Sequence, residues 1–263
     1  MKLETLGLIT EFAIASADAQ IQDNGDHIIV ATPDNPDFYF GNFVIFAKPP
    51  TLDSISVWEN IFSQNFPKAE HKAFAWQGHI TTDDSTKLKA RGYQIYEHIV
   101  LQRNTNPSST PQTDLTCRPL VSDADWDAAV QNHYEARQLS EELQKKRLRF
   151  LQKLFAKFRR LTLGQSAVWY GAFLQDELIG TLGICACENL GRFQEVVLKE
   201  KFRSQGFGTQ FVALAMNDAL TRLPIDTFVI VAEAGSVAER VYRKLGFGEA
   251  TREQGMLWVA QTP

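Results

Sequence analysis

The most constraining feature of the chain is a strand-to-helix junction that carries two glycines. Phe193 to Leu198 is an apolar run of β-like composition, and a helical apolar pattern follows between Phe211 and Ala215. Gly206 and Gly208 lie between the two patterns. A junction of this kind presents consecutive backbone N–H groups, together with the positive end of a helix, to an anion. The sequence therefore predicts a binding site for a phosphate-bearing ligand.

Two common phosphate-binding loops do not fit this junction. A Walker loop needs a lysine directly after its glycines, and none follows Gly208. A dinucleotide fingerprint that starts at Gly206 needs a third glycine where Phe211 stands. The segment does resemble the R/QxxGxG/A loop of the GCN5-related N-acetyltransferases, the GNAT superfamily, with Arg203, Gly206 and Gly208 at the motif positions.

A second motif lies closer to the C-terminus. Residues 226–233 indicate a buried strand, and Ser236 to Glu239 has the pattern of a capping box at the start of a helix. Gly246 stands where such a helix would end. With Ala238 and Tyr242 in register, this stretch resembles the family's A-x-x-x-Y-x-K-x-G-F signature. Because the two motifs follow each other in the family's order, we identify the chain as similar to the GNAT proteins.

The resemblance implies an α/β (α+β) GNAT fold, in which helices flank a mixed central β-sheet. Hydrophobic periodicity beyond residue 114 agrees with it, since it indicates a strand at 115–120, helices at 123–137 and 140–160, a hairpin over 167–187, the strand and helix of each motif, and a last strand near 256–260. A polar stretch with two prolines, Arg103 to Asp114, marks a boundary. We therefore predict an N-terminal domain over residues 1–104, a linker over 105–113 and a catalytic GNAT domain over 114–263.

The N-terminal domain contains a fainter version of the same closing elements. Lys87 to Leu101 has a short helix, a glycine, an aromatic residue and a strand in this order. The segment from Tyr242 to the last strand has the same order. Before it, the patterns indicate strands at 27–32, 42–47 and 71–76 and a helix at 54–65. Nothing in this part matches RxxGxG. We predict a smaller, degenerate GNAT-like domain that no longer binds cofactor, in a tandem arrangement.

The resemblance also implies acetyl-CoA as cosubstrate, with no metal. We expect the N–H groups of the loop to hold the diphosphate, and the backbone of the preceding strand to pair with the pantetheine arm. The glycines allow close approach where a Cβ would obstruct. Arg203 is expected to brace the loop. The predicted cofactor contacts are Val196, Val197, Leu198, Arg203, Ser204, Gln205, Gly206, Phe207, Gly208 and Thr209.

Tyr242 is the predicted general acid, because the tyrosine of this motif points towards the thioester sulfur in the family. The alternative is a helix tyrosine whose ring packs in the core with its hydroxyl at the surface. Glu195, at the start of the cofactor strand, is the predicted general base. Glu233, at the end of the neighbouring strand, and a chain of water molecules are the alternatives.

The composition fits a soluble enzyme with a cationic acceptor. The 263 residues are 44% hydrophobic, and the formal charge of -4 argues against nucleic-acid binding. No apolar stretch approaches the roughly 20 residues that span a bilayer, and the N-terminus lacks a signal-peptide pattern. We therefore expect a cytoplasmic protein without a membrane partner, and we leave a homodimer open. The acceptor is expected to be a small-molecule amine, or a peptide N-terminus or lysine.

Three further features have two interpretations each. We interpret Cys117, Cys185 and Cys187 as buried thiols and not as metal ligands. The basic residues within 140–160 are interpreted as a solvated helix face, with a polyanion or cofactor-phosphate contact as the alternative. Turn chemistry and aromatic packing explain a group of four N-terminal residues, which could otherwise line an acceptor cleft: Tyr39, Asn42, His71 and Trp76.

Two functions of different classes are consistent with the sequence. The first is an N-acetyltransferase that works by direct attack in a ternary complex, because no Cys or Ser lies in a nucleophile motif. The second is a non-catalytic coenzyme A-binding module with a regulatory or protein-interaction role. The presence of both the loop motif and Tyr242 favours the enzyme.

Overall fold

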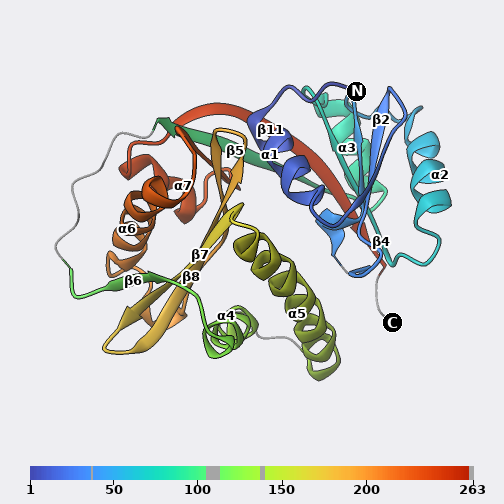
Figure 1. Ribbon diagram of the computed structural model, residues 1–263. Helices are drawn as coiled ribbons and strands as arrows, with labels where there is room; N and C mark the ends of the chain where they lie inside the picture. Colours follow the sequence, from blue (N-terminus) through green and yellow to red (C-terminus); the bar gives the residue numbers. More distant parts are fainter. Residues whose placement is uncertain (37, 105–112, 137–139, 261–263) are drawn as a thin grey trace. The chain divides into compact units, whose positions relative to one another are not determined.

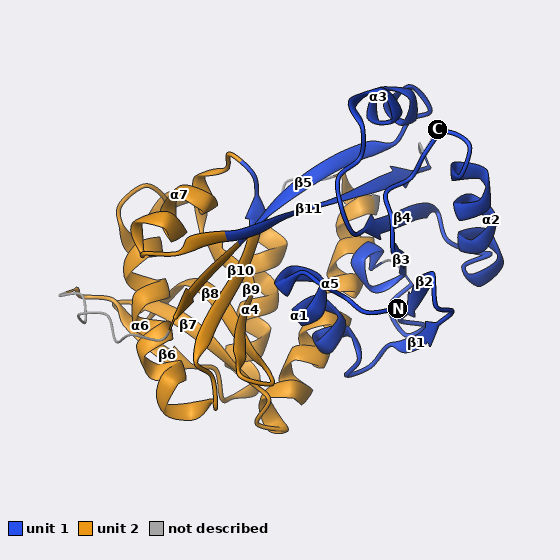
Figure 2. Cartoon of the chain, turned by 90° about the horizontal axis from the view of Figure 1, so that it is seen from above, with its two compact units in different colours: residues 1–100, 232–234, 250–263 blue, residues 101–231, 235–249 orange. Residues whose placement is uncertain are grey.

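The computed structural model describes residues 1–36, 38–104, 113–136 and 140–260 (Figure 1). The chain forms two compact units, which Figure 2 colours separately. Unit 1 comprises residues 1–100, 232–234 and 250–263, and unit 2 comprises 101–231 and 235–249. The linker predicted over 105–113 lies outside the described residues, apart from Thr113.

Unit 1 contains a sheet with helices on both of its faces. Strands β1, β2 and β3 are antiparallel, β3 and β4 are parallel, and β11 pairs antiparallel with β4. Alternate residues of these strands enter two separate apolar clusters, so that Phe46 packs in one and Ile45 in the other. The elements in chain order are α1 (Leu6–Ala15), β1 (Gln20–Asp23), β2 (His27–Ala31), a 3-10 turn (Tyr39–Gly41), β3 (Phe43–Phe46), α2 (Ile55–Asn65), β4 (His71–Trp76), α3 (Thr82–Ala90), β5 (Gln94–Asn104) and, from the end of the chain, β11 (Gly248–Val259).

Unit 2 is a mixed sheet with two helices on each face. Strands β6 to β9 are antiparallel neighbours, and β10 runs parallel to β9. In both views α6 and α7 lie on one face and α4 and α5 on the other (Figures 1 and 2). The elements are β6 (Thr116–Pro119), α4 (Asp123–Glu135), α5 (Glu141–Leu163), β7 (Ala167–Leu174), β8 (Glu177–Cys187), β9 (Leu190–Leu198), a 3-10 turn (Glu200–Phe202), α6 (Phe207–Arg222), β10 (Thr227–Glu233) and α7 (Val237–Lys244). The predicted fold class is confirmed.

The same series of elements occurs twice along the chain. The order α-β-β-β-α-β-α-β describes α1 to β5 and again α5 to β11. In both copies three antiparallel strands precede a helix and a strand parallel to the third. The first copy has no counterpart of β6 and α4 among the described residues. This repetition is what a tandem arrangement of two GNAT-like halves requires.

The two copies differ at the parallel strand pair. In the first, β3 stays paired with β4 up to its last residue, Phe46. In the second, the pairing of β9 with β10 covers Leu190 to Arg192, although β9 continues to Leu198. The parallel pair therefore separates only in the second copy.

No helix in the described part of the chain is both long enough and apolar enough to cross a lipid bilayer.

Candidate active site

The site begins where β10 leaves the edge of β9. On the other edge of β9, Gln194 lies opposite Gly183 and Val197 lies opposite Thr181. Two residues of β9 therefore face one residue of β8, which is a β-bulge, and Glu195 within it has a φ of 48°. Val197 and Leu198 pair with β8 on one side, and on the other side β9 has no paired strand from Phe193 to Leu198 within the described residues. Such an edge can hydrogen-bond an extended ligand that carries amide groups.

The loop after β9 is built to present N–H groups. Ser204 and Gly206 have left-handed φ values of 62° and 87°, and Gly206 is the N-cap of α6. The N–H groups from Ser204 to Gly208 have no protein acceptor in the described part of the chain. The N–H of Thr209 donates to the Gly206 oxygen at 3.1 Å, so it belongs to the helix and not to the presented group. Alternating backbone conformations followed by a helix N-terminus form a concave anion site.

Side chains on either side of the loop fix its shape. The Nε of Arg203 donates to the Leu198 oxygen at 3.0 Å, and Nε2 of Gln205 donates to the Lys201 oxygen at 2.7 Å. The rings of Phe202 and Phe207 meet edge to face, with centroids 6.2 Å apart. Arg203 therefore holds the loop to the end of β9, and the N–H groups are the part of the loop that a phosphate could contact.

The two glycines of the loop meet different requirements. A Cβ on Gly206 would have no atom within 4 Å, so only its left-handed φ favours glycine there. A Cβ on Gly208 would come within 3.3 Å of Leu198 Cδ1, so packing against β9 restricts that position. The residues present therefore fit a diphosphate held by backbone amides.

Tyr242 lies on α7 with its ring buried. Its ring packs edge to face on Phe247, with centroids 6.0 Å apart, and Phe247 in turn packs on Phe193, where β9 leaves β10. The hydroxyl has no hydrogen-bond partner among the described residues. Burial raises the pKa of Tyr242 well above its usual value. The hydroxyl is therefore protonated at neutral pH, which a general acid requires.

Glu195 has a buried neighbour that the sequence analysis did not identify. Its Oε2 lies 3.5 Å from Nδ1 of His133 on α4, and Nε2 of His133 lies 3.0 Å from Oγ1 of Thr181. Burial, and secondarily the charge of Arg147, lowers the pKa of His133 from 6.5 to about 4. The imidazole is therefore neutral at pH 7. A carboxylate only accepts hydrogen bonds, so we assign the ring proton to Nδ1 and an accepting role to Nε2.

A signal for His133 was present in the sequence. Trp126, Ala129 and His133 are spaced i, i+3 and i+7 on α4, and all three are buried. A histidine on the apolar stripe of a helix beside the predicted cofactor strand is a candidate for a buried polar contact. The contact of His133 with Glu195 could not be predicted from the sequence, because the bulge that holds Glu195 depends on strand pairing.

The other residues considered from the sequence lie in packed surroundings. The Asn42 amide bonds the Thr32 N–H and the oxygens of Asn35 and Phe38, and His71 Nε2 lies 3.1 Å from the Asn42 oxygen. The His71 and Tyr39 rings pack at 4.5 Å, and Trp76 is buried in an apolar cluster of unit 1. Turn chemistry and aromatic packing thus account for these four residues.

Cys185 and Cys187 are buried thiols, and Cys117 is half-buried. Within the described residues no three His, Cys, Asp or Glu side chains gather as metal ligands would.

Comparison with known proteins gives the same fold. Residues 169–259, less than half of the chain, match the family described as FR47-like protein, and a search of curated proteins found no match. A functionally unknown conserved protein from Staphylococcus epidermidis has a TM-score of 0.72 at 16% identity, over 92% of this chain and 95% of that one. For a GCN5-related N-acetyltransferase from Kribbella flavida the TM-score is 0.63 at 13% identity, over 98% of both chains. A tandem GNAT protein from the clavulanic acid biosynthesis pathway gives 0.54 at 13%, over 84% of this chain and 76% of that one.

At these identities the structural likeness shows the fold, and the fold is that of the GNAT proteins. The family match adds sequence similarity over the segment that contains the Arg203 loop and Tyr242. The resemblance predicted from the two motifs is confirmed at the level of the fold, and residues 169–259 match the FR47-like family.

Proposed function

We propose that the protein is an N-acetyltransferase that transfers an acetyl group from acetyl-CoA to a primary amine, by direct attack in a ternary complex. The observation that carries the proposal is the separation of β9 from β10 directly before a loop with five presented N–H groups. Strand edge and loop follow each other on one stretch of chain, as a ligand with an amide-rich arm and a diphosphate requires.

When bound, acetyl-CoA supplies the activated acetyl group as a thioester. The loop from Ser204 to Gly208 would hold the diphosphate, and the backbone of Val196, Val197 and Leu198 would align the arm. A backbone N–H of β9 at the bulge would donate to the thioester carbonyl. Contacts of this type typically lower a barrier by about 3 to 4 kcal/mol.

Two side chains would move the protons of the reaction. Glu195 would accept a proton from the acceptor nitrogen, and the lone pair of that nitrogen would then attack the acetyl carbon. As the new C–N bond forms, the C–S bond breaks and Tyr242 gives its hydroxyl proton to the leaving sulfur. The neutral His133, fixed by Thr181, would orient Glu195 without cancelling its charge.

The N-terminal half would take no part in cofactor binding. Its corresponding junction contains Pro49 and Pro50, which have no N–H to donate. The N–H groups of Thr51 and Leu52 already donate to Ser54 and Asp84 at 2.9 and 3.1 Å. The predicted cytoplasmic location and homodimer remain predictions.

The test is release of free thiol from acetyl-CoA by the purified full chain with a panel of primary amines. Amine-dependent release, with acetylated amine detected by mass spectrometry, is the expected result. Coenzyme A binding without transfer to any amine would instead support a non-catalytic module. Absence of coenzyme A binding by a folded protein would overturn both assignments.

A further inference from the structure

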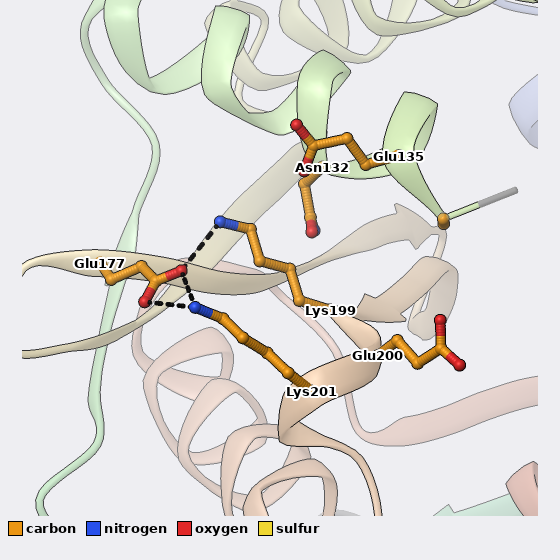
Figure 3. A pocket seen from close by; sticks show the side chains of 7 residues that line it. Asn132, Glu135, Glu177, Lys199, Glu200 and Lys201 are labelled. Atoms are coloured by element: carbon orange, nitrogen blue, oxygen red, sulfur yellow. Dashed lines mark hydrogen bonds and ion pairs between the residues drawn. The ribbon is translucent and has the colours of Figure 1, made fainter. Parts of the chain in front are cut away.

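A second feature of unit 2 is a cavity of about 380 Å³ at the end of α4 (Figure 3). Its walls come from three places in the chain: the last turn of α4, the start of β8, and the segment that follows β9. The lining residues are Asn132, Glu135, Ala136, Glu177, Lys199, Glu200 and Lys201. The volume is within the range of small-molecule sites.

Asn132 is the residue that indicates a ligand. It is 2% exposed, and neither the oxygen nor the nitrogen of its side-chain amide has a hydrogen-bond partner among the described residues. Figure 3 shows this side chain extending from α4 into the cavity, towards Lys199. A buried amide without partners is unfavourable, so such a group is normally satisfied by a protein atom, an ordered water or a ligand. Asn132 can give such a molecule both a donor and an acceptor.

One group of charged side chains in the cavity is net positive. Lys199 and Lys201 both approach Oε1 of Glu177, at 3.2 and 2.9 Å. The hydrogen bonds from Lys201 and then Lys199 lower the pKa of Glu177, so two cations share one ionised carboxylate and this group keeps a net charge of +1. Figure 3 shows the three side chains together.

Two further carboxylates, Glu135 and Glu200, also line the cavity. Glu135 accepts a hydrogen bond from the neutral Gln131 amide at 2.7 Å, and Glu200 has no ion-pair partner in the described part of the chain. Figure 3 shows Glu135 beside Asn132 on α4, and Glu200 extending away from Lys199 and Lys201. A ligand that fills this cavity therefore meets a positive group, a negative group and a neutral amide.

We propose that this cavity binds a zwitterionic ligand of the α-amino acid type. Its carboxylate would lie at Lys199 and Lys201, its ammonium at Glu135 or Glu200, and a polar group at the Asn132 amide. The inference rests on the proposed function in one respect, because such a ligand carries the primary amine that acetyl transfer needs. Asn132 also precedes His133, whose ring contacts the predicted base Glu195.

The experiment is titration calorimetry on the full chain without acetyl-CoA, using free L-amino acids, their C-terminal amides and their N-acetyl derivatives. At least one free amino acid is expected to bind, and its two derivatives at least tenfold more weakly, since each lacks one charge. Derivatives that bind as tightly as the free amino acid would overturn the proposal, as would a lack of binding by every amino acid tested.

Variants assign the binding to this cavity. Asn132→Ala and the surface change Lys201→Ala are each expected to weaken amino-acid binding about tenfold, and Asp127→Ala, exposed on the same helix, is the matched control. Lys201→Ala keeps the test decisive if Asn132→Ala does not fold. Wild-type affinity in Lys201→Ala would overturn the assignment.

The same titration with coenzyme A separates the two proposals. Coenzyme A binding without amino-acid binding rejects the zwitterion site and leaves the transferase. Amino-acid binding without coenzyme A binding rejects the transferase, and with it the acceptor role of this cavity.

Discussion

Replacing Gly206 by alanine tests the cofactor loop through its backbone alone. The residue has a φ of 87°, and a Cβ there would have no atom within 4 Å. The substitution therefore adds no clash, and its cost is that of a left-handed conformation for a non-glycine residue, roughly 1 to 2 kcal/mol. Because no neighbouring atom holds the loop in this conformation, we expect the free loop of Gly206→Ala to relax, so that its free energy of unfolding falls by less than that amount.

The same strain should appear in coenzyme A affinity. In the free variant the loop relaxes to another conformation, and binding must restore the one that presents the N–H groups. A penalty of roughly 1 to 2 kcal/mol reduces the population of the competent loop about 5- to 30-fold, and the Kd for coenzyme A rises by the same factor. Titration calorimetry measures this Kd, and urea denaturation measures the stability.

Gly25, in the turn between β1 and β2, provides a matched control. Its φ is 90°, and a Cβ there would also have no atom within 4 Å. Gly25→Ala should therefore lower the stability by no more than about 1 to 2 kcal/mol while leaving coenzyme A affinity unchanged. Wild-type affinity in Gly206→Ala, or an equal loss in both variants, would refute the role of the loop conformation.

Three further predictions concern unit 2. Tyr242→Phe should lower turnover about 10- to 1000-fold with little change in coenzyme A affinity, because only the proton donor is removed; normal turnover in a thiol-release assay would remove the assignment. The pKa of His133 in the folded protein is about 4, below its ordinary value of 6.5. The unfolded chain therefore takes up the proton first as the pH drops. Stability falls between these two pH values, by about 3 kcal/mol for this group. Urea denaturation of His133→Gln should show a smaller loss between pH 7 and 4.5 than the wild type, and an equal loss would contradict the buried neutral ring. Asp125 caps α4 and accepts from Arg118 at 2.8 Å, so Asp125→Ala should lower stability by about 1 to 2 kcal/mol in the same assay, and a change below about 0.5 would speak against the cap.

Elements with strong local signals were predictable, and α5 shows why. Its apolar stripe and basic face repeat with helical spacing, and the helix runs from Glu141 to Leu163, close to the predicted 140–160. Helix α1 was not predicted, because no side chain at its own N-terminus provides a cap. The cap comes from Glu253, which accepts from the Leu8 N–H at 2.9 Å and also from the Thr5 hydroxyl. A partner 245 residues away leaves no local pattern.

Some residues of the candidate site were also predictable from local sequence, and others were not. The loop glycines and Tyr242 lie in motifs whose spacing is local, so the sequence could place them on a junction and a helix. The conformation of Glu195 depends on a bulge in the pairing of β9 with β8, and its contact with His133 joins a strand to a helix. Both depend on tertiary structure, and the single-residue offset of a bulge is not encoded by hydrophobic alternation.

The repeated order of elements allows a last prediction, on stoichiometry. If the order of elements were enough for cofactor binding, each half would bind coenzyme A, because both contain the same strands and helices in sequence. The structure favours one site. The strand pair β3 and β4 stays closed to Phe46, and the junction after it contains Pro49 and Pro50.

Calorimetry of the full chain should therefore give one coenzyme A per chain, and Gly206→Ala should weaken that single isotherm. Two sites, or a second isotherm that Gly206→Ala leaves intact, would show that the N-terminal half binds the ligand without a separated strand pair. The separation of the parallel strands would then no longer explain which half binds the cofactor.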